Sequence, residues 1–156
     1  MKIHLLAVGI RMPDWIKTGY AEYAERLPRE CQLNLIEIPA GKRSTRANLP
    51  RLVRAEGERL LAAIPASSRV IALDERGQEW GTAELAGQLA SWLQEGCNLS
   101  LLIGGPDGLD AACRDRAEHL WSLSRLTLPH PLVRIVVAEQ LYRAWSLLHN
   151  HPYHRV

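Results

Sequence analysis

A glycine-rich turn directly follows a short apolar run in the second half of the chain. Residues 99–103 have the length and composition of a buried strand, and the segment Gly104-Gly-Pro-Asp-Gly108 comes next. In α/β proteins, ligand sites form at the carboxyl ends of strands, and glycine, which has no Cβ, lets a flat ligand lie against the main chain. The spacing differs from the Gly-x-Gly-x-x-Gly dinucleotide fingerprint. Taken alone, the turn fits an ordinary strand-to-helix connection better than a site.

A second candidate is an irregular segment in which two prolines bracket His130, read as Leu123-Ser-Arg-Leu-Thr-Leu-Pro-His-Pro131. Such a segment can present main-chain N–H and C=O groups to a heterocycle while its leucines cover the ring faces. In isolation, a simple connection into the following helical pattern is the slightly better interpretation.

Basic side chains gather in and after residues 40–47, which we call the basic loop. They are Lys42, Arg43, Arg46, Arg51 and Arg54. They could hold RNA phosphates, or they could simply be the solvated side chains of a loop and a helix start. The segment also imitates part of a P-loop, but Ile36 occupies the position that requires the first glycine, so that interpretation is rejected.

The end of the chain, His149-Asn-His-Pro-Tyr-His-Arg155, is dense in side chains that stack on bases, carry protons or bind phosphate. Its three histidines are spaced around a proline without cysteine or carboxylate partners, so no metal site is predicted. We expect a tail that faces RNA. No nucleophilic triad and no paired carboxylates for glycoside chemistry stand out elsewhere.

The composition indicates one globular domain, residues 1–156, with 47% hydrophobic residues to form its core. A net charge of +2 does not by itself indicate a nucleic-acid partner. The three cysteines form no Cys-x-x-Cys pair, which favours free thiols in a reducing compartment. The apolar start is too short for a signal peptide, and no stretch could span a bilayer. We therefore expect a cytoplasmic protein without a membrane segment.

Strand and helix patterns alternate along the chain. The expected strands are residues 3–8, 33–38, 70–73, 99–103 and, more weakly, 120–123. Between them, Asp14 is a plausible N-cap of a helix that runs to Leu27, and Asn48 can cap a second helix with Pro50 in its first turn. A third begins at Thr82 and ends before Gly96. This alternation predicts an α/β fold with a mostly parallel sheet covered by helices on both faces.

The last helical pattern, residues 132–148, is apolar around nearly its whole circumference, with Pro131 suited to the first helical position. Such a helix is buried on all sides. We expect one side to pack on the sheet and another on a second subunit. A central core helix within a monomer is the alternative.

Four segments together resemble one known family. They are Gly104-Gly-Pro-Asp-Gly108, the stretch from Leu123 to Arg134, Glu139-Gln-Leu-Tyr-Arg-Ala-Trp145 and Asn150-His-Pro-Tyr-His-Arg155. They are similar to the ribosomal RNA large subunit methyltransferase H family, the small pseudouridine N3-methyltransferases of the SPOUT class. Met12-Pro-Asp-Trp15 and Ile36-Glu-Ile-Pro-Ala-Gly-Lys-Arg43 match too, and the resemblance covers essentially the whole chain.

The resemblance implies a trefoil-knotted α/β fold, an exception to the rule that chains do not thread through loops. It also implies a homodimer formed through the last helix, with no appended RNA-binding domain. The knot of the family forms the S-adenosylmethionine site. The matching positions here are Leu73, Gly104, Leu123, Ser124, Arg125, Leu126, Thr127 and Leu128.

The implied reaction is methyl transfer from S-adenosylmethionine to N3 of a pseudouridine in large-subunit (23S) ribosomal RNA within the assembled ribosome. His130 and His154 are the candidate bases for the N3 proton, because histidine titrates near neutral pH. Arg143 and Arg155 could stabilise developing negative charge or hold phosphate. Tyr153 could stack on a flipped base. Glu139 could orient one of these groups.

Two positions depart from the family pattern. Asp107 stands where the family usually has Glu, which we expect to matter little if the turn works through its backbone, and Arg125 is often a smaller residue. Three other functions remain open: a SPOUT methyltransferase with a different RNA target, a non-catalytic ribosome-binding protein, and a plain α/β nucleotide-binding module.

Overall fold

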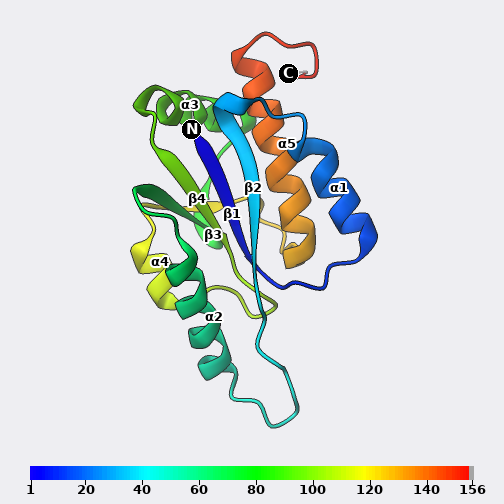
Figure 1. Cartoon of the computed structure of the whole chain (residues 1–156), viewed down its shortest axis with the longest axis vertical. Coiled ribbons are helices and arrows are strands. Elements are labelled where there is room, and N and C mark those ends of the chain that lie inside the picture. Colours follow the sequence, from blue (N-terminus) through cyan, green and yellow to red (C-terminus); the bar gives the residue numbers. More distant parts are fainter. Residues whose placement is uncertain (155–156) are drawn as a thin grey trace.

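The computed structural model describes residues 1–154 and shows a five-stranded parallel sheet with helices on both faces (Figure 1). The strands lie in the order β2-β1-β4-β3-β5. Their bounds are β1 Lys2–Val8, β2 Gln32–Ile38, β3 Ser68–Glu79, β4 Asn98–Ile103 and β5 His119–Ser122. All five strands expected from the apolar runs are confirmed. Because every pairing is parallel, their carboxyl ends meet at one edge of the sheet.

β3 continues well beyond the apolar run that predicted it. Its pairing with β5 breaks between Leu73 and Gln78 and then resumes at Trp121. Gly77 lies against β5 so closely that a Cβ there would be 2.5 Å from the carbonyl carbon of Leu120. A strand interior that holds Asp74, Glu75 and Arg76 has no apolar period, which is why the sequence pattern ended at residue 73.

The helices occupy the predicted intervals, except that the first ends at Ala24 and not at Leu27. They are α1 Asp14–Ala24, the short 3₁₀ helix η1 Arg29–Cys31, α2 Leu49–Ala63, α3 Thr82–Glu95, α4 Ala111–Arg116 and α5 His130–Leu148. The Asn48 cap is confirmed, since its side chain accepts a hydrogen bond from the Arg51 N–H. Gly96 ends α3 in the left-handed conformation, with φ +71°.

Two details at helix starts were predicted wrongly. Pro13, not Asp14, is the N-cap of α1, and Asp14 is its first residue, where a carboxylate interacts favourably with the helix dipole. α5 begins at His130, so Pro131 takes its second position. The first helical turn has no carbonyl partner for its N–H groups, so proline is tolerated at either position.

Side-chain alternation along the strands divides the core into two halves. Ile3, Leu5 and Ala7 of β1 face one way and join α1, α3 and α5, while Leu6 and Val8 face α2 and α4. Figure 1 shows this arrangement, with α1 and α5 on one side of the sheet and α2 and α4 on the other. A sheet covered on both faces explains why its strands are almost continuously apolar.

α5 packs along α1 and α3 and is largely buried within this one chain. Val137, Ala138 and Leu141 are fully buried, in accordance with the all-round apolar pattern. Apolar side chains such as Leu132 and Val136 stay half-buried. The helix crosses the sheet so that its first turn lies at the carboxyl edge and its last turn lies at the opposite end (Figure 1). The two ends of α5 therefore lie far apart.

Candidate functional site

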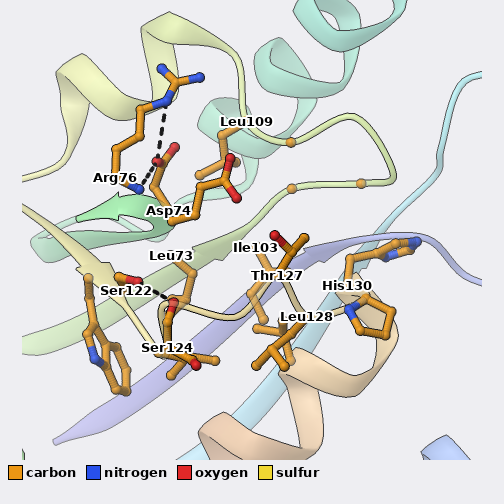
Figure 2. Close-up of a pocket in the computed structure, with 18 of the residues that line it drawn as sticks. Leu73, Asp74, Arg76, Ile103, Leu109, Ser122, Ser124, Thr127, Leu128 and His130 are labelled. Carbon is orange, nitrogen blue, oxygen red and sulfur yellow. Dashed lines mark hydrogen bonds and ion pairs between the residues drawn. The ribbon is translucent and has the colours of Figure 1, made fainter. Parts of the chain in front are cut away.

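A pocket of about 630 Å³ opens at the carboxyl edge of the sheet. Its floor is formed by Leu73, where the pairing of β3 with β5 breaks, and by Ile103 at the end of β4, and its rim is formed by two loops. One is the turn of residues 104–108, which we call the pocket loop, and the other is the segment 122–129 that connects β5 to α5. Figure 2 shows Asp74 and Arg76 on one side of the pocket, and Ser124, Thr127 and Leu128 on the other.

The pocket loop depends on its glycines. A Cβ on Gly104 would lie 2.5 Å from the carbonyl carbon of Gly108, closer than real Cβ contacts. Gly108 has φ +83°, and its N–H donates to the carbonyl of Gly105 at 3.0 Å. The turn therefore folds onto itself through bare backbone, and no other residue type fits at position 104.

Hydrogen bonds from its own serine hydroxyl groups fix the conformation of the segment 122–129. Ser122 Oγ donates to the carbonyl of Ser124 at 3.0 Å, and Ser124 Oγ accepts from the N–H of Leu126 at 2.9 Å. Leu123 and Leu128 then line the pocket, with Thr127 between them and His130. Leu126 is 75% exposed, an unusual position for a leucine unless something covers it.

The opposite wall is polar. Asp74 accepts a hydrogen bond from the N–H of Arg76 at 2.8 Å, and guanidinium groups of Arg76 and Arg114 approach its carboxylate to 4.0 Å. An apolar wall with main-chain groups facing a wall of charged side chains fits a ligand that has a flat heterocycle and polar substituents.

His130 stands at the inner end of the pocket, in the first turn of α5 (Figure 2). Its Nδ1 is buried and has no hydrogen-bond partner among residues 1–154. Burial lowers the pKa of the imidazole below its usual 6.5, and the nearby guanidinium groups of Arg134 and Arg43 lower it further, while Glu56 opposes them. An uncharged imidazole with a free nitrogen can accept a proton.

Arg134, one turn further along α5, fixes this first turn to the sheet. It is 1% exposed and donates to the carbonyl of Gly9 at 2.7 Å and to Glu37 at 2.8 Å. Its Nη2 also lies 3.5 Å from where a Cβ on Gly9 would be. A buried guanidinium needs such partners to offset its loss of water. It therefore anchors the helix that carries His130 to the ends of β1 and β2.

A second polar cluster joins the middle of α5 to the tail that follows it. Glu139 accepts from Arg143 Nη2 at 2.6 Å and from the Tyr153 hydroxyl at 2.8 Å. The Arg143 guanidinium lies 4.9 Å from the centre of the Tyr153 ring, which packs against Tyr142. Burial and the bond to Glu139 raise the pKa of Tyr153 to about 12, so its hydroxyl stays protonated. His154 Nδ1 is buried and has no partner within residues 1–154.

The predicted site residues thus form two groups. The pocket brings together His130 and all but one of the predicted cofactor positions, namely Leu73, Gly104, Leu123, Ser124, Leu126, Thr127 and Leu128. Arg125 is exposed and does not line it. Glu139, Arg143 and Tyr153 gather instead further along α5 and in the tail, and His154 follows Tyr153 directly. A helix rises about 1.5 Å per residue, so Glu139 and Arg143, 9 and 13 residues after His130, lie roughly 14 and 20 Å further along its axis. Arg155 lies outside the described residues.

Three features of the site were missed by sequence reasoning. Asp74 and Arg76 follow a predicted strand directly, so their place at the carboxyl edge could have been inferred. Arg134 could not, because a single arginine in an apolar helix gives no sign of being buried. Glu56 likewise has an ordinary place in an amphipathic helix, yet it is 2% exposed.

The basic loop is not uniformly free for RNA. Arg43 is bound to Glu56 and, through Nε, to Asp107 of the pocket loop at 2.9 Å. Lys42 and Arg46 are exposed. The expectation that Asp107 matters little therefore overlooks its side chain, which makes an ion pair that the sequence did not indicate.

Among residues 1–154, no group of histidine, cysteine and acidic side chains could hold a metal ion. None of the helices in that range is both long and apolar enough to cross a membrane.

Known proteins resemble this chain along its whole length. "Ribosomal RNA large subunit methyltransferase H" of Thioalkalivibrio sulfidiphilus is 60% identical over 155 residues, 99% of each chain. The proteins of the same name from Methylococcus capsulatus and Marinomonas sp. are 57% and 54% identical, over 99% of this chain and 100% of theirs.

Solved structures of low identity share the fold. A methylase family protein from Haemophilus influenzae superimposes with a TM-score of 0.58 at 13% identity, covering 99% of this chain and 70% of that one. A chain from work on "2-OH methylation of C/U34 on tRNA" gives 0.50 at 20% identity, covering 96% and 97%. The family description "Predicted SPOUT methyltransferase" matches residues 1–154. The chain therefore belongs to the SPOUT methyltransferases and, among them, to the ribosomal RNA large subunit methyltransferase H family.

Proposed function

We propose that this enzyme transfers a methyl group from S-adenosylmethionine to N3 of a pseudouridine in large-subunit ribosomal RNA, and that it acts on assembled ribosomes in the cytoplasm. The observation that carries the proposal is the pocket, which combines an apolar wall of main-chain and leucine groups with an uncharged, unpartnered His130. The names of the relatives at 54–60% identity support ribosomal RNA as the substrate.

S-adenosylmethionine, when bound, supplies a methyl group activated by its sulfonium. Leu73, Gly104 and the segment 123–128 would hold it. The protein must then align N3 of the base and remove the N3 proton as the N–C bond forms. His130 is the best-placed acceptor in this chain, because it lines the pocket and its Nδ1 has no hydrogen-bond partner among residues 1–154.

The tail cluster serves the pocket of a second subunit in this proposal. Within one chain, none of Glu139, Arg143, Tyr153 and His154 lines the pocket, and Glu139 and Arg143 follow His130 by about 14 and 20 Å along α5. The half-buried apolar side chains of α5 support a homodimer formed through this helix. Antiparallel packing of two copies of α5 would bring each tail toward its partner's pocket. The threading of residues 123–154 as a trefoil knot remains a prediction of the family resemblance.

Transfer of labelled methyl groups tests the proposal. The enzyme is incubated with labelled S-adenosylmethionine and either unmethylated ribosomes or the same ribosomal RNA stripped of protein. Label in intact particles, mapped by mass spectrometry to N3 of one pseudouridine, is the expected result. Label at another nucleotide would make the enzyme a SPOUT methyltransferase of different target. Label in neither substrate, without heat of cofactor binding, would leave a ribosome-binding protein.

A further inference from the structure

Arg43 makes more contacts to charged and polar partners than any other side chain of the basic loop. Its Nη1 and Nη2 donate to the two oxygens of Glu56 at 2.6 and 3.0 Å, a forked arrangement that suits guanidinium and carboxylate. Its Nε donates to Asp107 at 2.9 Å, and Nη1 also donates to the carbonyl of Gly41 at 2.9 Å. One guanidinium thus joins the basic loop, helix α2 and the pocket loop.

Glu56, which belongs to α2, also contacts both the basic loop and the pocket loop. It accepts a hydrogen bond from the Gly41 N–H at 2.8 Å, and its Oε1 lies 3.4 Å from where a Cβ on Gly105 would be. Gly105 in turn lies over Val8 at the end of β1, where a Cβ would come within 2.9 Å of Val8 Cγ1. The carboxylate is therefore wedged between the base of the basic loop and the base of the pocket loop.

Both groups of this pair are charged in the folded protein. Burial would raise the pKa of Glu56, but the hydrogen bonds from Arg43 and Gly41 outweigh burial and lower it. The bonds to Glu56 and Asp107 raise the pKa of Arg43. A charged pair this enclosed keeps a defined geometry, since losing one partner leaves the other buried and uncompensated.

We infer that Arg43 is a positioning residue for cofactor binding: by clamping Asp107 to Glu56, it fixes the pocket loop, residues 104–108, in the shape that the cofactor requires. Three of the loop's five residues are glycine, whose backbone loses most entropy on ordering, and the loop closes on itself through the Gly108 N–H. This inference rests on the proposed function for the identity of the ligand, but not for the clamp itself.

The clamp also places the RNA-facing and cofactor-facing parts of the site on one rigid unit. Lys42 and Arg46, which flank Arg43, are exposed and available to phosphate. Arg43 itself is engaged, so its role differs from that of its basic neighbours although the sequence makes them look equivalent.

Four variants distinguish the role of Arg43 in positioning the pocket loop from the effect of its positive charge. Asp107→Ala removes the exposed end of the clamp, and Arg43→Lys keeps the charge but loses the fork that reaches both carboxylates. Asp107→Glu keeps the carboxylate and should restore the clamp. Lys42→Met is the matched control, because it removes a charge from the neighbouring position. Circular dichroism and thermal melting establish that each variant is folded.

Two readouts are taken. Amide hydrogen exchange across residues 104–108 is measured without ligand, and the Kd of S-adenosylhomocysteine is measured by calorimetry. We expect Asp107→Ala and Arg43→Lys to exchange at least about tenfold faster and to bind about tenfold more weakly, roughly 1.4 kcal/mol. Asp107→Glu and Lys42→Met should stay within about twofold of the unmodified protein on both readouts.

Exchange and affinity in Asp107→Ala that match those of Lys42→Met would overturn the inference. Faster exchange with unchanged affinity would overturn it too, because the clamp would then hold the loop without serving the pocket. If the unmodified protein bound no S-adenosylhomocysteine, the proposed cofactor would be wrong. The exchange readout, measured without ligand, would still show whether Arg43 holds the loop.

Discussion

At the scale of single residues, the protonation state of His130 decides whether the pocket can remove a proton. Its depressed pKa leaves the ring uncharged at neutral pH. His130→Asn keeps a polar side chain of similar size but removes the base. We expect kcat to fall about 10²–10⁴-fold with the Kd of S-adenosylhomocysteine changed less than about threefold. His119→Asn is the control, since His119 is exposed on β5 away from the pocket lining. An equal loss of activity in both would remove His130 from the mechanism.

The same pKa shift predicts a pH profile. A base whose pKa lies below 6.5 is protonated, and so inactive, only as the pH falls through that depressed value. We expect kcat in single-turnover methylation to be flat from pH 7 to 8 and to decline below pH 6.5. The charges of Arg134 and Arg43 help to lower the pKa of His130. Because Arg43→Lys keeps the positive charge, it should leave the pH at which kcat declines nearly unchanged. An acid limb centred above pH 7 would contradict the assignment.

Single residues were also where the sequence was least informative. Glycines at 104 and 108 and the histidine between two prolines could be singled out, because glycine and proline constrain the backbone wherever they occur. Arg43 and Lys42 could not be distinguished. Which of two adjacent cations is paired depends on Glu56 and Asp107, 13 and 64 residues further along the chain.

At the scale of elements, the start of α2 determines where the basic loop ends. Asn48 caps the helix by accepting from the Arg51 N–H at 3.2 Å. Asn48→Ala should lower the free energy of unfolding by about 1 kcal/mol, as measured by urea denaturation. Ser44→Ala, in the same loop but not bonded to a helix N–H, should change it by less than about 0.5 kcal/mol. A loss below about 0.3 kcal/mol for Asn48→Ala would show that the cap is not formed in solution.

The pocket loop and α3 offer a matched pair of glycines. Gly104→Ala places a Cβ 2.5 Å from a backbone atom that cannot move aside. We therefore expect the Kd of S-adenosylhomocysteine to rise by more than about tenfold. Gly87, on the exposed face of α3, has open space around its Cβ position. Gly87→Ala should keep the affinity and stabilise the protein by about 0.5–1 kcal/mol. Unchanged affinity in Gly104→Ala would mean that the loop does not contact the ligand.

Elements were the scale at which the sequence was most informative. The apolar runs of β1, β2 and β4 and the capped patterns of α2 and α3 each carry their own signal, because burial on both faces of a parallel sheet leaves little choice of residue. β3 beyond Leu73 has no such signal, since Asp74–Arg76 are polar and the strand is held by its pairing with β5. That pairing joins residues 43 or 48 positions apart and is invisible to a local pattern.

At the scale of the whole molecule, the distance between pocket and tail is the decisive fact. His130 and the cluster around Glu139 sit on one helix, on which Glu139 and Arg143 follow His130 by about 14 and 20 Å, and a helix is too stiff to shorten that distance. The family resemblance named all of these residues as one site, yet in one chain they form two groups. We therefore propose that a site that uses both groups is assembled from two subunits, with each tail completing its partner's pocket.

Mixed dimers test this directly. Gly104→Ala disables the pocket and His154→Ala disables the tail, and each variant alone should be inactive on ribosomes. If the site is shared, a mixed dimer has one intact pocket beside one intact tail, since the two lesions fall together in the other site. Random exchange in an equal mixture makes about half of the dimers mixed, so about a quarter of the unmodified activity should return. If each chain completed its own site, both sites of every dimer would carry a lesion and no activity would return.

Differently tagged subunits, purified in tandem, report the activity of the mixed species alone, which should reach about half of the unmodified value. Zero activity in that purified species would show that the tail acts within its own chain, whereas full activity of His154→Ala alone would show that His154 is not needed.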